Sequence, residues 1–248
     1  MRLTQSGHES SPRWSPDSRW IAFLSERRAP AGKGRESDDS KEDDSKGVAQ
    51  LYLISPDGGE AFPVTEGEEE VHAVAWSADA KTLYFATRTP WNKEQKDDYK
   101  KIWKDTLQYR AAERGDTIYS LDLAHAIDLH AAGGTRETPK AEKESNTTLS
   151  ANAIASTPWR VQQLEAAPDG RRLAFVTTSV SQRQEKLEEF EIYSVELAQA
   201  SPQTPPHQLT HNEAFEQELT WANDSRHLFF AVQQGSVEGK YRDFQERL

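Results

Sequence analysis

Short apolar runs recur along the chain, and each of them follows a polar turn. Four such runs occupy residues 20–24, 82–86, 173–176 and 228–232. Consecutive apolar positions, many of them β-branched or aromatic, are typical of a strand that is buried on both faces. The pattern therefore predicts strands that lie between two neighbouring sheets.

Each apolar run ends a phrase that occurs four times. The phrase reads WSPDSRWIAF at 14–23, and related copies occupy 76–85, 166–175 and 221–230. Its aspartate can accept a hydrogen bond from the backbone amide two residues later, and the small residue that follows tolerates unusual backbone angles. Each copy therefore predicts two strands joined by a tight turn, with equivalent places for Trp14, Trp76, Ala166 and Trp221.

A third strand with a central tyrosine follows at 50–54, 117–121 and 191–195, and a short fourth strand at 64–65 and 209–210. Four strands in a repeated unit are the pattern of a β-propeller blade. The predicted fold class is all-β: a partial β-propeller of about four blades of four-stranded antiparallel sheet. One helical insertion is expected near residues 92–114.

We expect a single propeller domain or fragment over residues 1–248, with blades at 5–65, 71–158, 160–210 and 215–248. The second blade contains the helical insert at 91–115, the last blade is incomplete, and residues 1–4 form the tail of a preceding blade. Both ends therefore cut through blades, which favours a fragment of a longer protein. The alternative is that another chain completes the missing blade, and open blade edges offer a surface for oligomerisation.

The insert has the features of an amphipathic helix. Asn92 and Gln95 can form an N-terminal capping box, and Gly115 is a suitable stop. One apolar stripe is formed by Tyr99, Ile102, Trp103, Thr106 and Leu107. This stripe indicates a helix packed over one face of the propeller, and a lid or docking element is the alternative. The polar segments 35–46 and 130–156 are predicted to be loops, and the first lacks the glycine and final glutamate of an EF-hand.

Composition narrows the range of partners. Thirty basic and 41 acidic residues give a net charge of −11, which argues against nucleic acid and against an anionic membrane. No apolar run is long enough to span a membrane, and the first residues lack a signal-peptide core. The chain has no cysteine, so disulfides and thiol chemistry are excluded. We expect a cytoplasmic protein, with a periplasmic location as the alternative if a leader precedes Met1.

The usual catalytic motifs are absent from the sequence. It has no Gly-x-Ser-x-Gly elbow, phosphate loop, dinucleotide fingerprint or His-Glu-x-x-His motif. We therefore expect no catalytic residue, metal or cofactor in this chain, and we expect the chain alone to be inactive. His207 and His211 flank a strand end and are expected at the surface. The only candidate binding residues are Glu68, Glu69 and Glu70, whose carboxylates could attract a cationic ligand, although a charge run before a strand is usually a solvated turn.

The phrase at 14–23 and the segment QLYLISPDGGE at 50–60 resemble the propeller repeats of the prolyl oligopeptidase family of serine peptidases. The resemblance is nearest to the acylaminoacyl-peptidase and dipeptidyl-peptidase-like branches. The segment 99–116, which contains YKKIWKD and ERGD, is similar to a helical insert in the bacterial propellers of those branches. TolB-type propellers carry a similar repeat phrase but not the insert.

The resemblance implies that the propeller covers an α/β-hydrolase domain, absent from this chain, and restricts access to short peptides. The catalytic triad of the family lies in that other domain. Some members read the free amine of a substrate with a pair of propeller glutamates, but the setting of Glu68–Glu70 does not match, so this role is not transferred. Two hypotheses follow: a non-catalytic gating domain with peptide substrates, or a TolB-like or WD-type propeller that acts as a protein-interaction scaffold.

Overall fold

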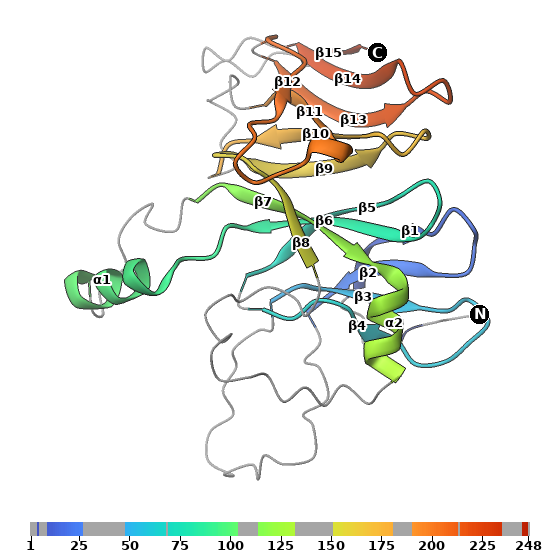
Figure 1. Ribbon diagram of the computed structural model, residues 1–248. Helices are drawn as coiled ribbons and strands as arrows, with labels where there is room; N and C mark the ends of the chain where they lie inside the picture. Colours follow the sequence, from blue (N-terminus) through green and yellow to red (C-terminus); the bar gives the residue numbers. More distant parts are fainter. Residues whose placement is uncertain are drawn as a thin grey trace.

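The computed structural model describes residues 4, 9–26, 48–67, 69–103, 114–131, 151–180, 190–212, 214–234 and 245–247. These residues form four antiparallel sheets that follow one another in chain order, from the sheet of β1 to that of β15 (Figure 1). Two α-helices accompany the sheets. The fold class is therefore the expected one, a partial β-propeller with a helical insertion.

Each sheet is made of strands that are consecutive in the chain. The first contains β1 Glu9–Trp14, β2 Ile21–Ser25, β3 Gln50–Ile54 and β4 Phe62–Pro63. The second contains β5 Val71–Trp76, β6 Thr82–Arg88, β7 Asp116–Asp122 and β8 Ala151–Ser156. The third contains β9 Arg160–Ala166, β10 Arg172–Thr178, β11 Ile192–Glu196 and β12 His207–Gln208. The fourth contains β13 Phe215–Trp221, β14 Leu228–Gln234 and β15 Gln245–Arg247.

The register of the strands confirms the sequence repeat. In every sheet the last residue of the first strand pairs with the residue seven positions later. The four pairs are Trp14 with Ile21, Trp76 with Leu83, Ala166 with Leu173, and Trp221 with Leu228. The four predicted places are therefore equivalent.

The aspartate of each phrase closes its turn as expected. Its carboxylate accepts a hydrogen bond from the amide two residues later, at 3.1 Å in the first two copies and 3.0 and 2.8 Å in the last two. The following small residue has a positive φ of 61°, 58°, 69° or 56° at Ser18, Ala80, Gly170 and Ser225. In the fourth turn, the hydrogen bond from the Arg226 amide, helped by His227, lowers the pKa of Asp224 to about 2.

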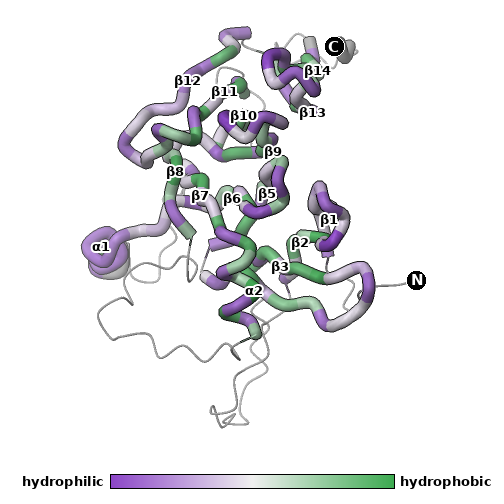
Figure 2. Tube along the Cα trace, turned by 45° about the vertical axis from the view of Figure 1, so that its right-hand side comes forward, coloured by the Kyte–Doolittle hydropathy of each residue, from purple (hydrophilic) through white to green (hydrophobic). Residues whose placement is uncertain are grey.

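The core lies between the sheets, on both faces of the second strands. Leu83 and Phe85 of β6 are buried with β2 and β3, whereas Tyr84 and Ala86 are buried with β9 and β10. The same alternation joins the third sheet to the fourth. Figure 2 shows the hydrophobic colour concentrated on these central strands, while α1 is hydrophilic. The runs that are apolar at consecutive positions are thus strands buried between sheets.

In each sheet the connection from the second to the third strand leaves at the same end, whereas the connection from β7 to β8, which begins with α2, leaves at the opposite end. Because consecutive strands are antiparallel, the β1–β2 type of turn lies at one end of each sheet, and the β2–β3 type of connection lies at the other. The latter connections leave after Ser25, Arg88, Thr178 and Gln234. We call this the insert end. The connections from β4 to β5, β8 to β9 and β12 to β13 lie there as well.

The structure differs from the sequence expectations at two places. Ala151–Ser156 forms strand β8, and Leu123–Ala131 forms helix α2, although residues 130–156 were expected to be a loop. A short third strand, β15, is present in the last sheet. Residues 104–113, the second half of the expected insert helix, and the acidic segment 35–46 lie outside the described residues.

The positive φ of Ser18 in the first turn can be tested by substitution. Replacing Ser18 by glycine should raise the free energy of unfolding by roughly 0.5–1 kcal/mol, because glycine tolerates positive φ without steric cost. Ser18→Val should lower it, since a β-branched side chain is strained there. Urea titration measures both changes. The control is Ser10→Gly on exposed β1, where no gain is expected; a gain there equal to that at Ser18 would contradict the explanation.

Candidate functional site

Paired charges gather at the insert end of the second sheet. Glu69, in the connection from β4 to β5, accepts a 2.5 Å hydrogen bond from Arg114 Nη2 and lies 4.0 Å from Arg88 Nη1. Glu70 accepts a 2.7 Å hydrogen bond from Arg160 Nη2. Burial alone would raise the pKa of Glu70, but the hydrogen bond and positive charge of Arg160 outweigh it, so that pKa is lowered. Both carboxylates are therefore already paired with arginine side chains.

A buried histidine–aspartate pair lies beside these ion pairs. His72 Nε2 and Asp116 Oδ2 are 2.5 Å apart, and both side chains are almost fully buried. The same carboxylate oxygen accepts a 2.6 Å hydrogen bond from the Val161 amide at the start of β9. The backbone of Asp116 also bonds to Trp159 and Thr157. This residue thus ties the second sheet to the third.

Arg114 and Gly115 hold together the two chain segments between which α1 is inserted. Arg114 Nη1 donates to the Thr89 carbonyl at 2.9 Å, and its guanidinium lies 4.6 Å from the centre of the Trp91 ring. The Thr89 amide bonds to the Gly115 carbonyl at 2.9 Å. The insert is therefore anchored at its base by the same arginine that pairs with Glu69.

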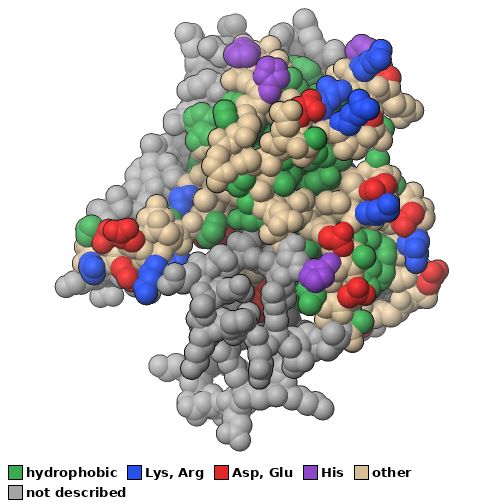
Figure 3. All heavy atoms as spheres, in the orientation of Figure 1, with side chains coloured by type: hydrophobic (Ala, Val, Ile, Leu, Met, Phe, Trp, Pro, Cys, Tyr) green, Lys and Arg blue, Asp and Glu red, His purple; other side chains and the backbone are tan. Residues whose placement is uncertain are grey.

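The helix α1, Lys93–Trp103, begins with the expected capping box. The Asn92 amide donates to Gln95 Oε1 at 3.0 Å, and the Gln95 amide donates to Asn92 Oδ1 at 2.8 Å. The expectation that its stripe packs on the propeller is wrong at Ile102, which is 71% exposed. Figures 1 and 3 show α1 projecting from the sheets, with acidic and basic side chains on its surface.

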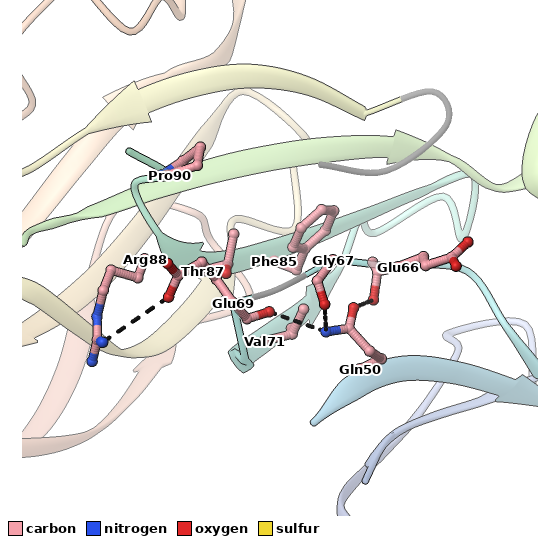
Figure 4. Close-up of a pocket in the computed structure, with 10 residues that line it drawn as sticks. Gln50, Glu66, Gly67, Glu69, Val71, Phe85, Thr87, Arg88 and Pro90 are labelled. Atoms are coloured by element: carbon pink, nitrogen blue, oxygen red, sulfur yellow. Dashed lines mark hydrogen bonds and ion pairs between the residues drawn. The ribbon is translucent and has the colours of Figure 1, made fainter. Parts of the chain in front are cut away.

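A small pocket opens next to the Glu69 ion pair. It holds about 250 Å³, including its solvent-filled mouth, between the first and second sheets. Gln50 fixes its rim, because its side-chain amide donates to the carbonyls of Gly67 and Glu69 at 3.4 and 3.0 Å (Figure 4). Phe85 and Val71 form its apolar floor, and Arg88 closes one side.

A second acidic group lies at the insert end between the third and fourth sheets. Glu216 is fully buried and accepts a 2.7 Å hydrogen bond from Thr210 and another from Asn212. Burial raises the pKa of Glu216 to about 7, outweighing these hydrogen bonds, and the charge of nearby Glu191 adds to the rise. No described arginine or lysine pairs with it, in contrast to Glu69 and Glu70.

The residues that the sequence singled out as site candidates do not form one common site in the structure. Glu68 lies outside the described residues, whereas Glu69 and Glu70 are bound by arginines rather than open to a cationic ligand. His207 and His211 are exposed, as expected. Sequence reasoning missed the buried pair of His72 and Asp116, whose 44-residue separation carries no motif.

Comparison with known proteins supports the fold and indicates a relative. No protein-family model matches the chain. The structure is similar to TolB from Acinetobacter baumannii, with a TM-score of 0.50, 14% identity, and coverage of 98% of this chain and 41% of that one. It is also similar to the tricorn protease, with a TM-score of 0.51, 13% identity, and coverage of 93% and 21%. These likenesses define the class of protein as a β-propeller.

One curated relative is similar in sequence. It is described as the uncharacterized peptidase YuxL of Bacillus subtilis (strain 168), and it is 32% identical over 99 residues. The alignment covers 40% of this chain and only 12% of the relative. In the part of the chain that the structure describes, no helix has the length and apolar character needed to span a membrane. The cytoplasmic location stays a prediction.

A substitution at Gly115 tests how tightly the base of the α1 insert is packed against the neighbouring backbone. A Cβ at this position would lie 2.6 Å from Pro158 Cα and still closer to the Thr157 carbonyl, and neither backbone group can move freely. Gly115→Ala should therefore lower the free energy of unfolding by about 2 kcal/mol or more. Gly170→Ala is the matched control, since Gly170 has open space and only a positive φ, and should cost roughly 1 kcal/mol. If chemical denaturation showed equal losses in the free energy of unfolding for the two variants, the close approach of the Thr157–Pro158 backbone to Gly115 would be contradicted.

The raised pKa of Glu216 predicts how the free energy of unfolding depends on pH. The pKa of Glu216 is about 7 in the folded protein, above its ordinary value of 4.5. Between pH 4.5 and 7, the folded protein therefore keeps a proton on Glu216 that the unfolded chain has already released. The free energy of unfolding should therefore fall as pH rises from 5 to 8, by roughly 3 kcal/mol at most. Glu216→Gln should remove this fall, whereas Glu218→Gln, at an exposed site on the same strand, should keep it. Urea titrations of both variants between pH 5 and 8 measure whether each keeps or loses the fall in stability.

Proposed function

We propose that this chain is a non-catalytic propeller that selects peptide substrates for a serine peptidase, whose α/β-hydrolase domain lies elsewhere in the same protein. The observation that carries the proposal is the 32% identity over 99 residues with a protein described as a peptidase. The aligned segment is only 12% of that relative. The relative therefore has ample length for a separate catalytic domain.

The arrangement of the insert end supports a role in which the propeller limits the size of the peptides that can enter. The connections between second and third strands, including the α1 insert, leave the sheets there, and Arg114 fixes the base of the insert. Glu69 and Glu70 are neutralised by Arg114 and Arg160, so they attract a charged substrate only weakly. We therefore infer that the propeller sorts peptides by size at this end rather than by the charge of a terminal amine.

The chain itself is assigned no catalytic step. Acyl transfer needs a nucleophile, a base within hydrogen-bond reach and an oxyanion site. The sequence has no Gly-x-Ser-x-Gly elbow, and His72 is engaged with the Asp116 carboxylate in the described structure. Catalysis is therefore assigned to the separate domain.

The test compares two proteins: the 248-residue chain and the product of the whole reading frame that contains it. Short peptides and a serine-reactive probe should be turned over or labelled only by the longer product. In that product, replacing residues 92–113 by a short Gly-Ser linker should raise kcat/KM for long peptides relative to tripeptides. The expected change is roughly tenfold, which is about 1.4 kcal/mol in activation free energy.

The control is Ile102→Ala in the longer product, which removes an exposed side chain and leaves the anchor in place. It should leave the preference for peptide length unchanged. Labelling of the short chain by the probe would contradict the absence of catalysis. A longer product with no hydrolase motif and no peptide turnover would instead favour the interaction scaffold.

A further inference from the structure

Two neighbouring arginines at the insert end have N–H donors without an acceptor. Arg88 Nη1 lies 4.0 Å from Glu69 Oε2, beyond hydrogen-bond distance, and no described residue accepts a hydrogen bond from this guanidinium. Arg114 donates from its two terminal nitrogens to the Thr89 carbonyl and to Glu69, but its Nε is buried and has no partner. A buried donor without an acceptor is costly, and a bound anion is one explanation for it.

The local balance of charge also favours an anion. Glu69 supplies one negative charge beside the guanidinium groups of Arg88 and Arg114, and Glu70 is paired with a different arginine, Arg160. The charge of Arg88 helps to lower the pKa of Glu70, although no hydrogen bond joins the two side chains. One positive charge at Glu69 is therefore left to attract a negatively charged ligand.

The sequence repeat does not require a cation at the position of Arg88. This residue lies five positions after Leu83, at the end of β6. The equivalent residues in the other three sheets are Glu26, Thr178 and Gln233. Sheets of the same kind thus form with an acidic or an uncharged side chain at this place, so the arginine is a feature of the second sheet alone.

The pocket beside Glu69 indicates which kind of carboxylate fits. Arg88 lies on one side of the pocket, and the carboxylate of Glu66 lies on the other (Figure 4). The apolar floor between them is formed by Phe85 and Val71. In the last residue of a peptide, the side chain and the free carboxylate are attached to the same carbon. A volume of about 250 Å³, mouth included, admits a small apolar side chain there while the carboxylate faces the arginine.

We propose that Arg88 and Arg114 bind the C-terminal carboxylate of a short peptide, whose last side chain, small and apolar, enters the pocket beside Glu69. Arg88 offers a planar pair of N–H groups, which matches the two oxygens of a carboxylate. Arg114 adds its unpaired Nε, and its guanidinium is held 4.6 Å from the centre of the Trp91 ring. The inference rests on the proposed function, from which it takes peptides as the ligands.

Isothermal titration calorimetry on the 248-residue chain tests the proposal with four probes. The tripeptide of alanine with a free C-terminus should bind with a Kd of about 1 mM or lower. Three other probes should each bind at least about tenfold more weakly: its C-terminal amide, the same amide with a central aspartate, and acetate. The first two lack the terminal carboxylate, and acetate lacks the side chain beside it.

Variants of Arg88 locate the binding. Arg88→Gln should weaken binding of the free acid by about tenfold and leave binding of the amide unchanged. Arg88→Lys keeps the charge but loses the paired donors, so it should restore part of the affinity. The matched control is Arg19→Gln, at an exposed turn on the opposite end of the first sheet, which should leave the affinity unchanged. The comparison of the four probes needs no variant, so it stands even where a substitution unfolds the chain.

Several results would overturn the proposal. Equal affinities of the free acid and its amide would exclude a carboxylate site, and so would an Arg88→Gln chain that binds the acid as tightly as the unchanged chain. Acetate or the aspartate peptide binding as tightly as the free acid would exclude the peptide terminus as the ligand. The absence of any heat of binding at about 10 mM free acid would also exclude it.

Turnover of the free acid and of its amide by the product of the whole reading frame is recorded in parallel, so the two proposals fail separately. Binding of the free acid that depends on Arg88, without turnover, supports the carboxylate site and contradicts the peptidase assignment. Turnover of both peptides with equal kcat/KM and equal affinity contradicts the carboxylate site and supports the peptidase assignment.

Discussion

The second strand of each sheet needs a neighbour on both faces, and the rest of the structure depends on this constraint. In β6, Phe85 is buried against the first sheet, and Tyr84 is buried against the third. Each fully buried large apolar side chain contributes roughly 1.5–3 kcal/mol. A single sheet cannot supply that burial alone, so the sheets stabilise one another in series, as in other repeat proteins.

The polar cluster at the insert end is a consequence of this packing. Where strands of different sheets converge, their terminal side chains are removed from water, and buried charges are tolerated only when they are paired. Glu70 meets Arg160, and Asp116 meets both His72 and the Val161 amide. The ion pairs therefore join neighbouring sheets and hold the base of α1.

The elements that sequence predicted well are those governed by local chemistry. Asp79 closes its turn with an amide two residues away, and Asn92 caps α1 with a residue three positions later. The cluster could not be predicted, because His72 and Asp116 are 44 residues apart and meet only through sheet pairing. The strand β8 was missed since its sequence, ANAIAS, has weak β character and follows a long polar segment.

Two glutamates at the insert end, one half-buried and one fully buried, show how a neighbouring side chain decides the pKa of a carboxyl group. Glu70 lies just before β5 and Glu216 is the second residue of β13, and at each position burial alone would raise the pKa. Arg160 reverses the effect at Glu70, whereas at Glu216 the neighbours are a hydroxyl, an amide and another carboxylate. The interface between the second and third sheets is consequently held by charge at neutral pH. The interface between the third and fourth is held best when Glu216 keeps its proton, so the stability of this junction falls as pH rises through neutrality.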